Sequence, residues 1–269
     1  MRESIEVAGR TRTFTVAGTP SKDLVLVFHG SKQTGDKHRD FTGHAFDTLG
    51  VVAYLDGYRK QWNDARRQSS FAARTENVDD VGFARAVIDR LTAGHGIDPG
   101  RVFAVGYSNG GQMVMRLMHE APELLAGAAI IGATMPAPDD FLMPHPTPAP
   151  KPMPVLLIHG TKDPIVPYEG GPTKWWVRTL FKVGGESLSA PATAAYFARR
   201  NGITTDPVTT KVAPAVERTA HDQAGRPPVV LHTIHGGGHT IPGPRRNPAM
   251  LGRTNQDISA ADLIADLLR

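Results

Sequence analysis

The chain has 269 residues and a net charge of +4 at neutral pH, from 30 Lys and Arg and 26 Asp and Glu residues. Charged residues make up 21% and hydrophobic residues 40%, a balance typical of a globular protein that excludes a wholly disordered chain. The absence of cysteine excludes disulfides, thiolate metal sites and a cysteine nucleophile.

An opening β-hairpin is predicted by apolar residues that alternate with polar ones on both sides of a turn at 8–10. Two continuous apolar runs, at 24–28 and 51–55, are typical of strands buried on both faces. From Asn77 apolar residues recur every three or four positions, which predicts a helix ending near Gly94. Strands and helices then alternate: strands over 101–106, 125–131, 155–158 and 229–234, and helices over 109–120, 192–200 and from about 259 onward.

This alternation predicts an α/β fold with a mostly parallel central sheet, helices on both faces and an N-terminal antiparallel hairpin. No segment with the composition of a linker divides the sequence, so residues 1–269 are expected to form a single domain. The stretch 136–154 holds eight prolines and is expected to be a surface loop. Together with residues 165–190 it is a candidate cap.

A G-x-S-x-G motif at residues 106–110 marks the candidate nucleophile, Ser108. The motif lies between a predicted strand and a predicted helix. Gly106 and Gly110 remove Cβ atoms that would collide in so sharp a turn, and the turn lifts the Ser108 hydroxyl above the sheet. A serine N-cap beside two packing glycines is the alternative interpretation.

A nucleophilic serine needs a base, and the base needs an acid that orients it. Asp163 lies just beyond the strand over 155–158, and His239 follows a run of glycines after the strand over 229–234. His235 is the main alternative base. The other histidines near strand ends are interpreted as structural: His29, His159 and His232. Four further carboxylates are less favoured as the acid and are expected to be solvated: Asp139, Asp140, Asp206 and Asp222.

Two backbone amides are expected to complete the site as an oxyanion hole. The residue after the nucleophile, Asn109, supplies one N–H group. The loop after the strand over 24–28 supplies the other, which we assign to Ser31, with Lys32 or Gln33 as alternatives.

Four aromatic residues are candidate walls of an acyl or aryl pocket: Tyr107, Trp62, Trp175 and Trp176. Ordinary core packing is the alternative for each of them. The chemistry of a serine nucleophile needs no metal ion or organic cofactor, so none is expected.

Six segments between about residues 24 and 243 resemble the polyhydroxybutyrate depolymerase-like esterases, close to the feruloyl and acetylxylan esterases. They are Val27-Phe28-His29-Gly30, Gln61-Trp62-Asn63-Asp64, Asp79-Asp80-Val81-Gly82-Phe83, Gly106 through Met113, His159 through Tyr168 and Gly237 through Gly243. The resemblance implies the α/β-hydrolase fold and a serine ester hydrolase whose catalytic triad is Ser108, Asp163 and His239. It implies short hydroxyalkanoate, feruloyl or similar small esters as substrates.

The chain departs from this family where Ser31 and Ile203 stand in place of two cysteines that its members usually carry. Many relatives are secreted, whereas this sequence starts without an apolar signal segment; as it stands it is expected to be cytoplasmic, and the compartment stays open. There is no run of 18 apolar residues, and the basic residues are scattered. Neither a membrane span nor a nucleic-acid partner is therefore expected.

Two alternatives to an esterase remain open. A serine peptidase or amidase would use the same residues on the same fold. A non-catalytic binding protein on a hydrolase scaffold usually lacks a member of the triad, and here none is missing. The expected partner is a small-molecule or oligomeric ester, and the oligomeric state stays open.

Overall fold

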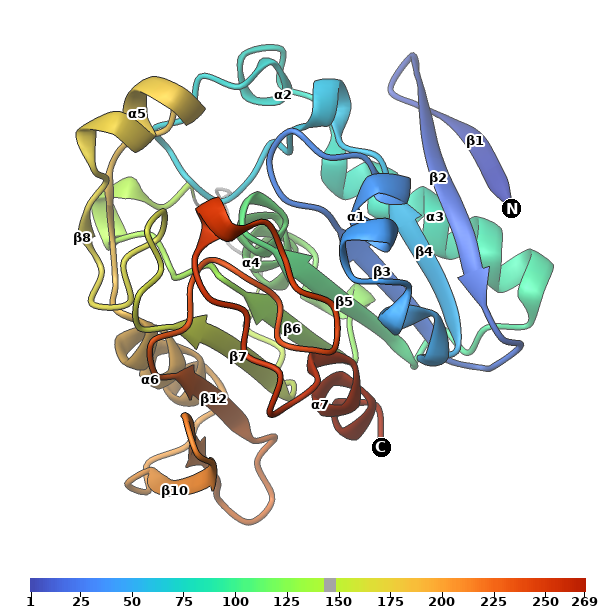
Figure 1. Ribbon diagram of the computed structural model, residues 1–269. Helices are drawn as coiled ribbons and strands as arrows, with labels where there is room; N and C mark the ends of the chain where they lie inside the picture. The colour runs from blue at the N-terminus through green and yellow to red at the C-terminus, as the bar shows by residue number, and fades with distance from the viewer. Residues whose placement is uncertain (143–148) are drawn as a thin grey trace.

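The computed structural model describes residues 1–142 and 149–269 and contains a ten-stranded sheet. The central strands, from β4 to β12, run parallel, and an antiparallel hairpin extends each edge (Figure 1). This confirms the expected α/β sheet with its N-terminal hairpin. From edge to edge the order is β1 (Arg2–Val7), β2 (Arg10–Gly18), β4 (Val51–Leu55), β3 (Leu24–Phe28), β5 (Val102–Tyr107), β6 (Gly127–Ile131), β7 (Val155–Gly160), β12 (Val229–Ile234), β11 (Val216–His221) and β10 (Val208–Ala213).

Helices cover both faces of the sheet because the central strands are apolar on both sides. In β3, Leu24 and Leu26 pack into one core, while Val25 and Val27 pack into the core on the opposite face. The first face is covered by α3 (Asp80–His95), α4 (Asn109–Glu120) and α6 (Ala190–Arg200), and the second by α1 (Gly35–Phe41) and α7 (Ala260–Leu267).

Local capping signals set the ends of these helices. The Asp79 carboxylate accepts a hydrogen bond from an amide in the first turn of α3, so the helix begins at Asp80. The expected end at Gly94 is wrong: the helix continues to His95 and ends at Gly96, whose φ of +66° suits glycine. At α7, Ser259 caps the helix by accepting from the amide of Asp262, at the spacing that the sequence predicts.

The hairpin of β10 and β11 is an element that the sequence pattern does not predict. Five of the six residues of β10 are exposed, so the strand has no alternation of apolar and polar positions. Its β-branched residues Val208, Thr209 and Thr210 are the remaining signal for a strand.

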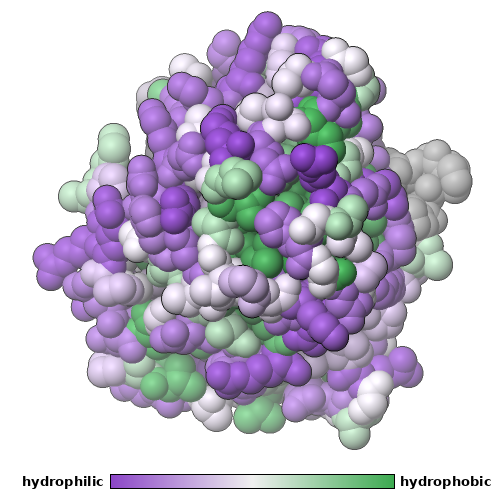
Figure 2. All heavy atoms as spheres, turned by 90° about the vertical axis from the view of Figure 1, so that its right-hand side faces the viewer, coloured by the Kyte–Doolittle hydropathy of each residue, from purple (hydrophilic) through white to green (hydrophobic). Residues whose placement is uncertain are grey.

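The opposite edge of the sheet carries charged residues. Arg2, Glu3 and Glu6 lie in β1, and charges on an edge strand oppose pairing with another sheet. Figure 2 shows this side of the molecule, where hydrophilic residues cover most of the face and hydrophobic ones appear between them near its centre. Among the described helices, none combines the length and the apolarity needed to cross a lipid bilayer.

Two segments, residues 136–142 and 165–190, form what we call the cap. The second contains β8 (Gly171–Pro172), α5 (Trp175–Phe181) and β9 (Glu186–Ser187), and Pro136 in the first pairs with Ser187. In Figure 1, α5 lies at the upper left, close to α2 (Ala72–Thr75) at the top. Residues 143–148 of the expected proline-rich loop lie outside the described residues.

Candidate active site

Ser108 occupies the turn between β5 and α4, with φ +54° and ψ −118°. Such a backbone conformation is costly for a residue other than glycine and persists where its surroundings enforce it. A Cβ on Gly106 would collide with the carbonyl oxygen of Gly110, and a Cβ on Gly110 would collide with that of Phe28. The two motif glycines therefore let β5, α4 and β3 meet closely enough to raise the Ser108 side chain above the sheet.

His239 lies between Ser108 and Asp163 and contacts both. Its Nε2 is 2.9 Å from the Ser108 hydroxyl, and its Nδ1 is 2.6 Å from a carboxylate oxygen of Asp163. Because an ionised carboxylate only accepts, Nδ1 carries the proton and Nε2 is free to accept one from Ser108. The imidazole is 3% exposed, so its bonds face little competition from water.

Asp163 is held by the turn that follows β7. One carboxylate oxygen accepts from the amides of Ile165 and Val166, each at 2.8 Å, and the other accepts from His239. Burial acts to raise the pKa of the Asp163 carboxyl. The nearby His239, the hydrogen bond from it, His159 and the Val166 amide outweigh burial, so the pKa lies below its ordinary value. The carboxylate is thus ionised at neutral pH.

The two residues predicted to supply the oxyanion donors, Ser31 and Asn109, both line the cleft. No described residue accepts a hydrogen bond from the amide of Ser31 or of Asn109. The alternatives to Ser31 are engaged elsewhere, since the Lys32 amide donates to the Lys60 carbonyl and the Gln33 amide donates to that of Gly30. Of the three candidate donors in this loop, Ser31 is therefore the one whose amide has no acceptor among the described residues.

The Ser108 hydroxyl opens into a cleft of about 500 Å³ walled by the cap and by the loop after β3. Of the four aromatic residues predicted for the pocket, Tyr107 and Trp176 line it. Trp62 does not, because it is fully buried and donates its indole N–H to the His29 carbonyl at 2.9 Å. Trp175 is 78% exposed and lies outside the lining. The interpretation of Trp62 and Trp175 as pocket walls is wrong.

The alternative base, His235, lies on the surface. It is half exposed, and its Nε2 is 3.1 Å from the carboxylate of Glu217. His29 instead holds two loops together: its Nδ1–H donates to the Gly30 carbonyl and its Nε2 accepts from the Gly57 amide. Burial lowers the pKa of His29 to about 4, which keeps the ring neutral in this role.

Two further histidines are buried within or beside strands. His159 in β7 donates from Nε2 to the Val166 carbonyl at 2.9 Å, and this nitrogen is 3.6 Å from Asp163. It therefore supports the turn that carries the acid. His232 lies in β12, and burial lowers its pKa to about 4.

Of the four carboxylates weighed against Asp163, Asp139, Asp206 and Asp222 are exposed. Asp140 is different, because its carboxylate accepts from the Gln68 side chain at 2.8 Å and from the Glu186 amide at 2.7 Å. It ties the two parts of the cap together and lines the cleft, so the expectation that it is merely solvated is wrong.

Two polar residues of the cleft, Gln112 and Thr134, were not among those predicted. Gln112 lies one turn after Ser108 on α4, and a spacing of four residues on a helix is the signal that could have found it. Its Nε2 donates to the Thr134 carbonyl at 2.7 Å. The Gln112 Oε1 and the Thr134 hydroxyl have no partner among the described residues.

A known family and curated relatives match the chain. The phospholipase/carboxylesterase family matches residues 56–176. The protein named "Putative esterase NocK" from Nocardia uniformis subsp. tsuyamanensis is 33% identical, over 98% of this chain and 81% of its own length. Feruloyl esterase B from Piromyces equi is 25% identical, over 82% of this chain and 40% of its own length.

A solved structure shares the fold. The acetyl xylan esterase from Aspergillus awamori aligns with a TM-score of 0.58 at 15% identity, over 91% of this chain and 96% of that one. Together with the curated relatives, this likeness confirms the resemblance to esterases that the six sequence segments predict.

Proposed function

The chain belongs to the carboxylesterase family of the α/β-hydrolases, and from that premise we propose that it cleaves carboxylic esters through an acyl-enzyme on Ser108. The observation that carries the mechanism is the line of hydrogen bonds from the Ser108 hydroxyl through His239 to Asp163. The amides of Ser31 and Asn109, which have no acceptor in the part of the chain that the structure describes, belong to the lining of the same cleft and support it.

In the first half-reaction, the Ser108 oxygen attacks the ester carbonyl carbon while His239 Nε2 takes its proton. Asp163 remains ionised and stabilises the imidazolium. The amides of Ser31 and Asn109 donate to the oxyanion of the tetrahedral intermediate, a contribution of about 3 kcal/mol per donor in comparable sites. The bond to the alcohol oxygen then breaks, and the alcohol leaves with the proton from Nε2.

In the second half-reaction, water attacks the acyl carbonyl and His239 takes its proton. The same two amides stabilise the second tetrahedral intermediate. The bond to the Ser108 oxygen breaks, this oxygen regains the proton from Nε2, and the carboxylic acid is released. The residues named supply every proton transfer that this cycle needs.

As substrates we propose small esters that carry a hydrogen-bond donor, such as short hydroxyalkanoate or feruloyl esters. Trp176 and Phe181 give the cleft apolar walls. The Gln112 amide is oriented by its bond to the Thr134 carbonyl, and its Oε1 is a buried acceptor without a partner among the described residues, on a side chain of the cleft lining. A buried acceptor without a partner favours a substrate that donates to it.

Paired p-nitrophenyl esters test this substrate class. The wild-type protein should prefer the 3-hydroxybutyrate ester to the butyrate ester in kcat/KM. In Gln112→Leu the preference should shrink by about 2- to 10-fold, the value of one hydrogen bond. An equal ratio in both proteins would show that Gln112 does not select the substrate.

Labelling of Ser108 tests the mechanism. A fluorophosphonate probe should modify the wild-type protein, and Ser108→Ala should abolish both labelling and ester turnover while leaving the melting temperature close to wild type. Full turnover in Ser108→Ala would exclude Ser108 as the nucleophile. Matched ester and anilide substrates separate an esterase from a peptidase or amidase, and absent labelling would indicate a binding protein.

A further inference from the structure

We propose that residues 57–66 form a clamp that sets the spacing between the two oxyanion-hole amides, with Asp64 as its central positioning residue. The clamp follows β4 and passes between the loop after β3 and the start of α4. This inference rests on the proposed function, because it concerns the donors to the oxyanion.

The first side of the clamp holds the loop that carries Ser31. The indole N–H of Trp62 donates to the His29 carbonyl at 2.9 Å, and the Gly57 amide donates to the ring of His29 at 2.9 Å. On the other side of Ser31, the Lys32 amide donates to the carbonyl of Lys60 at 3.0 Å. The loop is therefore tied to the clamp both before and after the donor.

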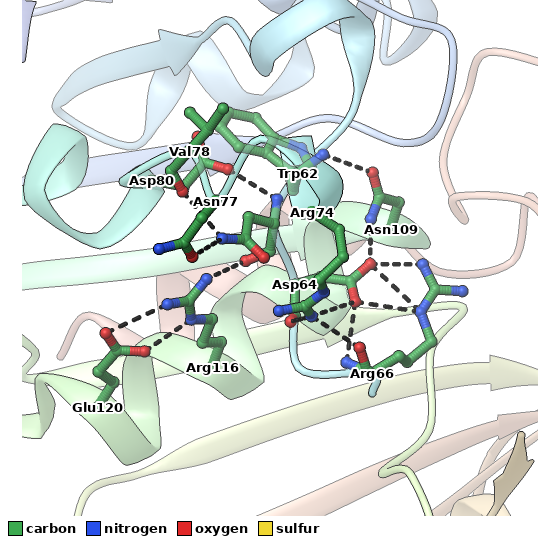
Figure 3. Close-up of polar contacts among 11 residues, drawn as sticks. Trp62, Asp64, Arg66, Arg74, Asn77, Val78, Asp80, Asn109, Arg116 and Glu120 are labelled. Atoms are coloured by element: carbon green, nitrogen blue, oxygen red, sulfur yellow. Dashed lines mark hydrogen bonds and ion pairs between the residues drawn. The ribbon is translucent and has the colours of Figure 1, made fainter. Parts of the chain in front are cut away.

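The second side of the clamp holds Asn109. The backbone amide of Trp62 donates to Asn109 Oδ1 at 3.0 Å, and Asn109 Nδ2 donates to Asp64 Oδ2 at 2.5 Å. Figure 3 shows the Asn109 side chain between these two partners. Both ends of the side-chain amide are thus used for positioning, while no described residue accepts from the backbone N–H of Asn109, which leaves it for the oxyanion.

Asp64 is a fully buried carboxylate that the protein neutralises with arginine. Arg66 donates to it from its amide at 2.9 Å and from Nη2 at 2.5 Å, and Arg74 donates to the carbonyls of Asp64 and Arg66 (Figure 3). A buried charge is stable only with such partners. An ionised acceptor also holds Asn109 more strongly than a neutral one would.

Asp64 does not line the cleft, whereas Asn109 does. The role of Asp64 is therefore to act through Asn109, and Trp62 joins the two sides because it bonds to both. An oxyanion hole binds negative charge that exists only in the transition state. Loosening the clamp should consequently lower kcat and leave KM nearly unchanged.

Four variants test the clamp: Asn109→Ala, Asp64→Asn, the exchange Asp64→Asn with Asn109→Asp, and Asn109→Asp alone as the reference for that exchange. Asn109→Ala and Asp64→Asn should each lower kcat roughly 10- to 100-fold and leave KM within about twofold of wild type. This fall in kcat is smaller than the 10²–10³-fold fall that follows the loss of an oxyanion-hole donor, because both donors are still present. Affinity for phenylboronic acid, whose adduct with serine places an oxygen in the hole, should fall by a similar factor. The exchanged pair should be at least about tenfold faster than Asn109→Asp alone, in which two carboxylates face each other.

Glu120→Gln is the matched control. Glu120 pairs with Arg116 at 2.6 Å, and Arg116 donates to the Asn63 carbonyl, so this change perturbs the clamp's surroundings without touching either donor (Figure 3). Glu120→Gln should leave kcat unchanged, and a lower melting temperature is the only effect that we expect from it.

Two outcomes would overturn the clamp. A kcat within twofold of wild type in folded Asn109→Ala, with Ser108→Ala inactive, would reject the clamp alone. Turnover in Ser108→Ala would reject the proposed function and the clamp with it. If Asp64→Asn does not fold, Asn109→Ala and the exchanged pair decide the question, because each of them keeps one carboxylate in the buried site that contains Arg66.

Discussion

Tyr107 donates its phenolic hydroxyl to the backbone carbonyl of His239 at 2.7 Å, so the residue before Ser108 holds the loop that carries the proposed base. The two rings lie 5.1 Å apart between centroids. Burial, with a smaller contribution from the charge of Asp163, raises the pKa of Tyr107 well above its ordinary value. The hydroxyl therefore remains a donor at any pH at which the protein would work.

Replacing Tyr107 by Phe should remove this hydrogen bond and keep the packing of the ring. We expect a loss of about 1 kcal/mol in the free energy of unfolding and a fall of roughly 2- to 10-fold in kcat/KM. Urea unfolding and ester hydrolysis measure the two effects. Tyr196→Phe, which removes a hydrogen bond to His119 outside the cleft lining, is the control, and equal activity in the two variants would contradict the role of Tyr107.

Changing His239 and His235 to alanine should have opposite results. His239→Ala should lose as much turnover as Ser108→Ala, because members of a triad act as a unit. His235→Ala should keep most of its turnover, since its ring bonds to Glu217 at the surface. Rates of p-nitrophenyl ester hydrolysis for the two variants check this. Loss of activity in His235→Ala alone would mean that the base is misassigned.

Asp163→Asn should lower kcat roughly 10³- to 10⁴-fold through the wrong imidazole tautomer. The amides of Ile165 and Val166 need an acceptor, so the asparagine oxygen should face them and its NH₂ should face His239 Nδ1. Nδ1 then has to accept, and the proton moves to Nε2, where it blocks proton transfer from Ser108. Single-turnover acylation measures the effect. Asp206→Asn, at an exposed acid, is the control and should act like wild type.

Stability should fall as the pH drops below about 6.5. Burial lowers the pKa of several histidines from an unfolded value of 6.5, so between 6.5 and the folded pKa the unfolded state binds more protons. The free energy of unfolding is therefore fully retained above 6.5 and declines toward pH 4, by up to about 1.4 kcal/mol per pH unit for each group. The folded pKa is about 4 for His29, His119 and His232 and about 3 for His38.

Urea unfolding at pH 7.5, 6 and 5 measures this slope, and His119→Asn should reduce it. Asparagine can keep the bond that His119 Nδ1 donates to the Met115 carbonyl, but it does not titrate. An unchanged slope in His119→Asn would show that this ring is not a source of the pH dependence.

The parts of the site that the sequence predicts are those with local signals. Gly106 and Gly110 flank the turn at Ser108, and Asp163 and His239 each follow an apolar strand. Parallel strands place their carboxyl ends at one edge of the sheet, so residues far apart in the chain are expected to meet there. The structure brings Ser108, His239 and Asp163 into contact at that edge.

The parts that the sequence does not predict depend on contacts between distant segments. From the sequence, Trp62 fits a pocket wall as well as a buried core position. Its hydrogen bonds to His29 and Asn109, which are distant in the chain, place it in the core. Asp64 is an acidic residue in a loop, and its burial follows from Arg66 and Arg74 closing around it. The exposed strand β10 has no apolar pattern to reveal it.

The backbone of Ser108 has a consequence for the evolution of this chain. Its positive φ costs about 1–3 kcal/mol for any residue with a Cβ, and glycine would adopt the same turn with little strain. A laboratory selection that rewards heat resistance alone would therefore favour glycine at the position on which the proposed chemistry depends. Variants selected for thermostability would have to be screened for turnover at every round, because the same substitution, Ser108→Gly, would both stabilise and inactivate the protein.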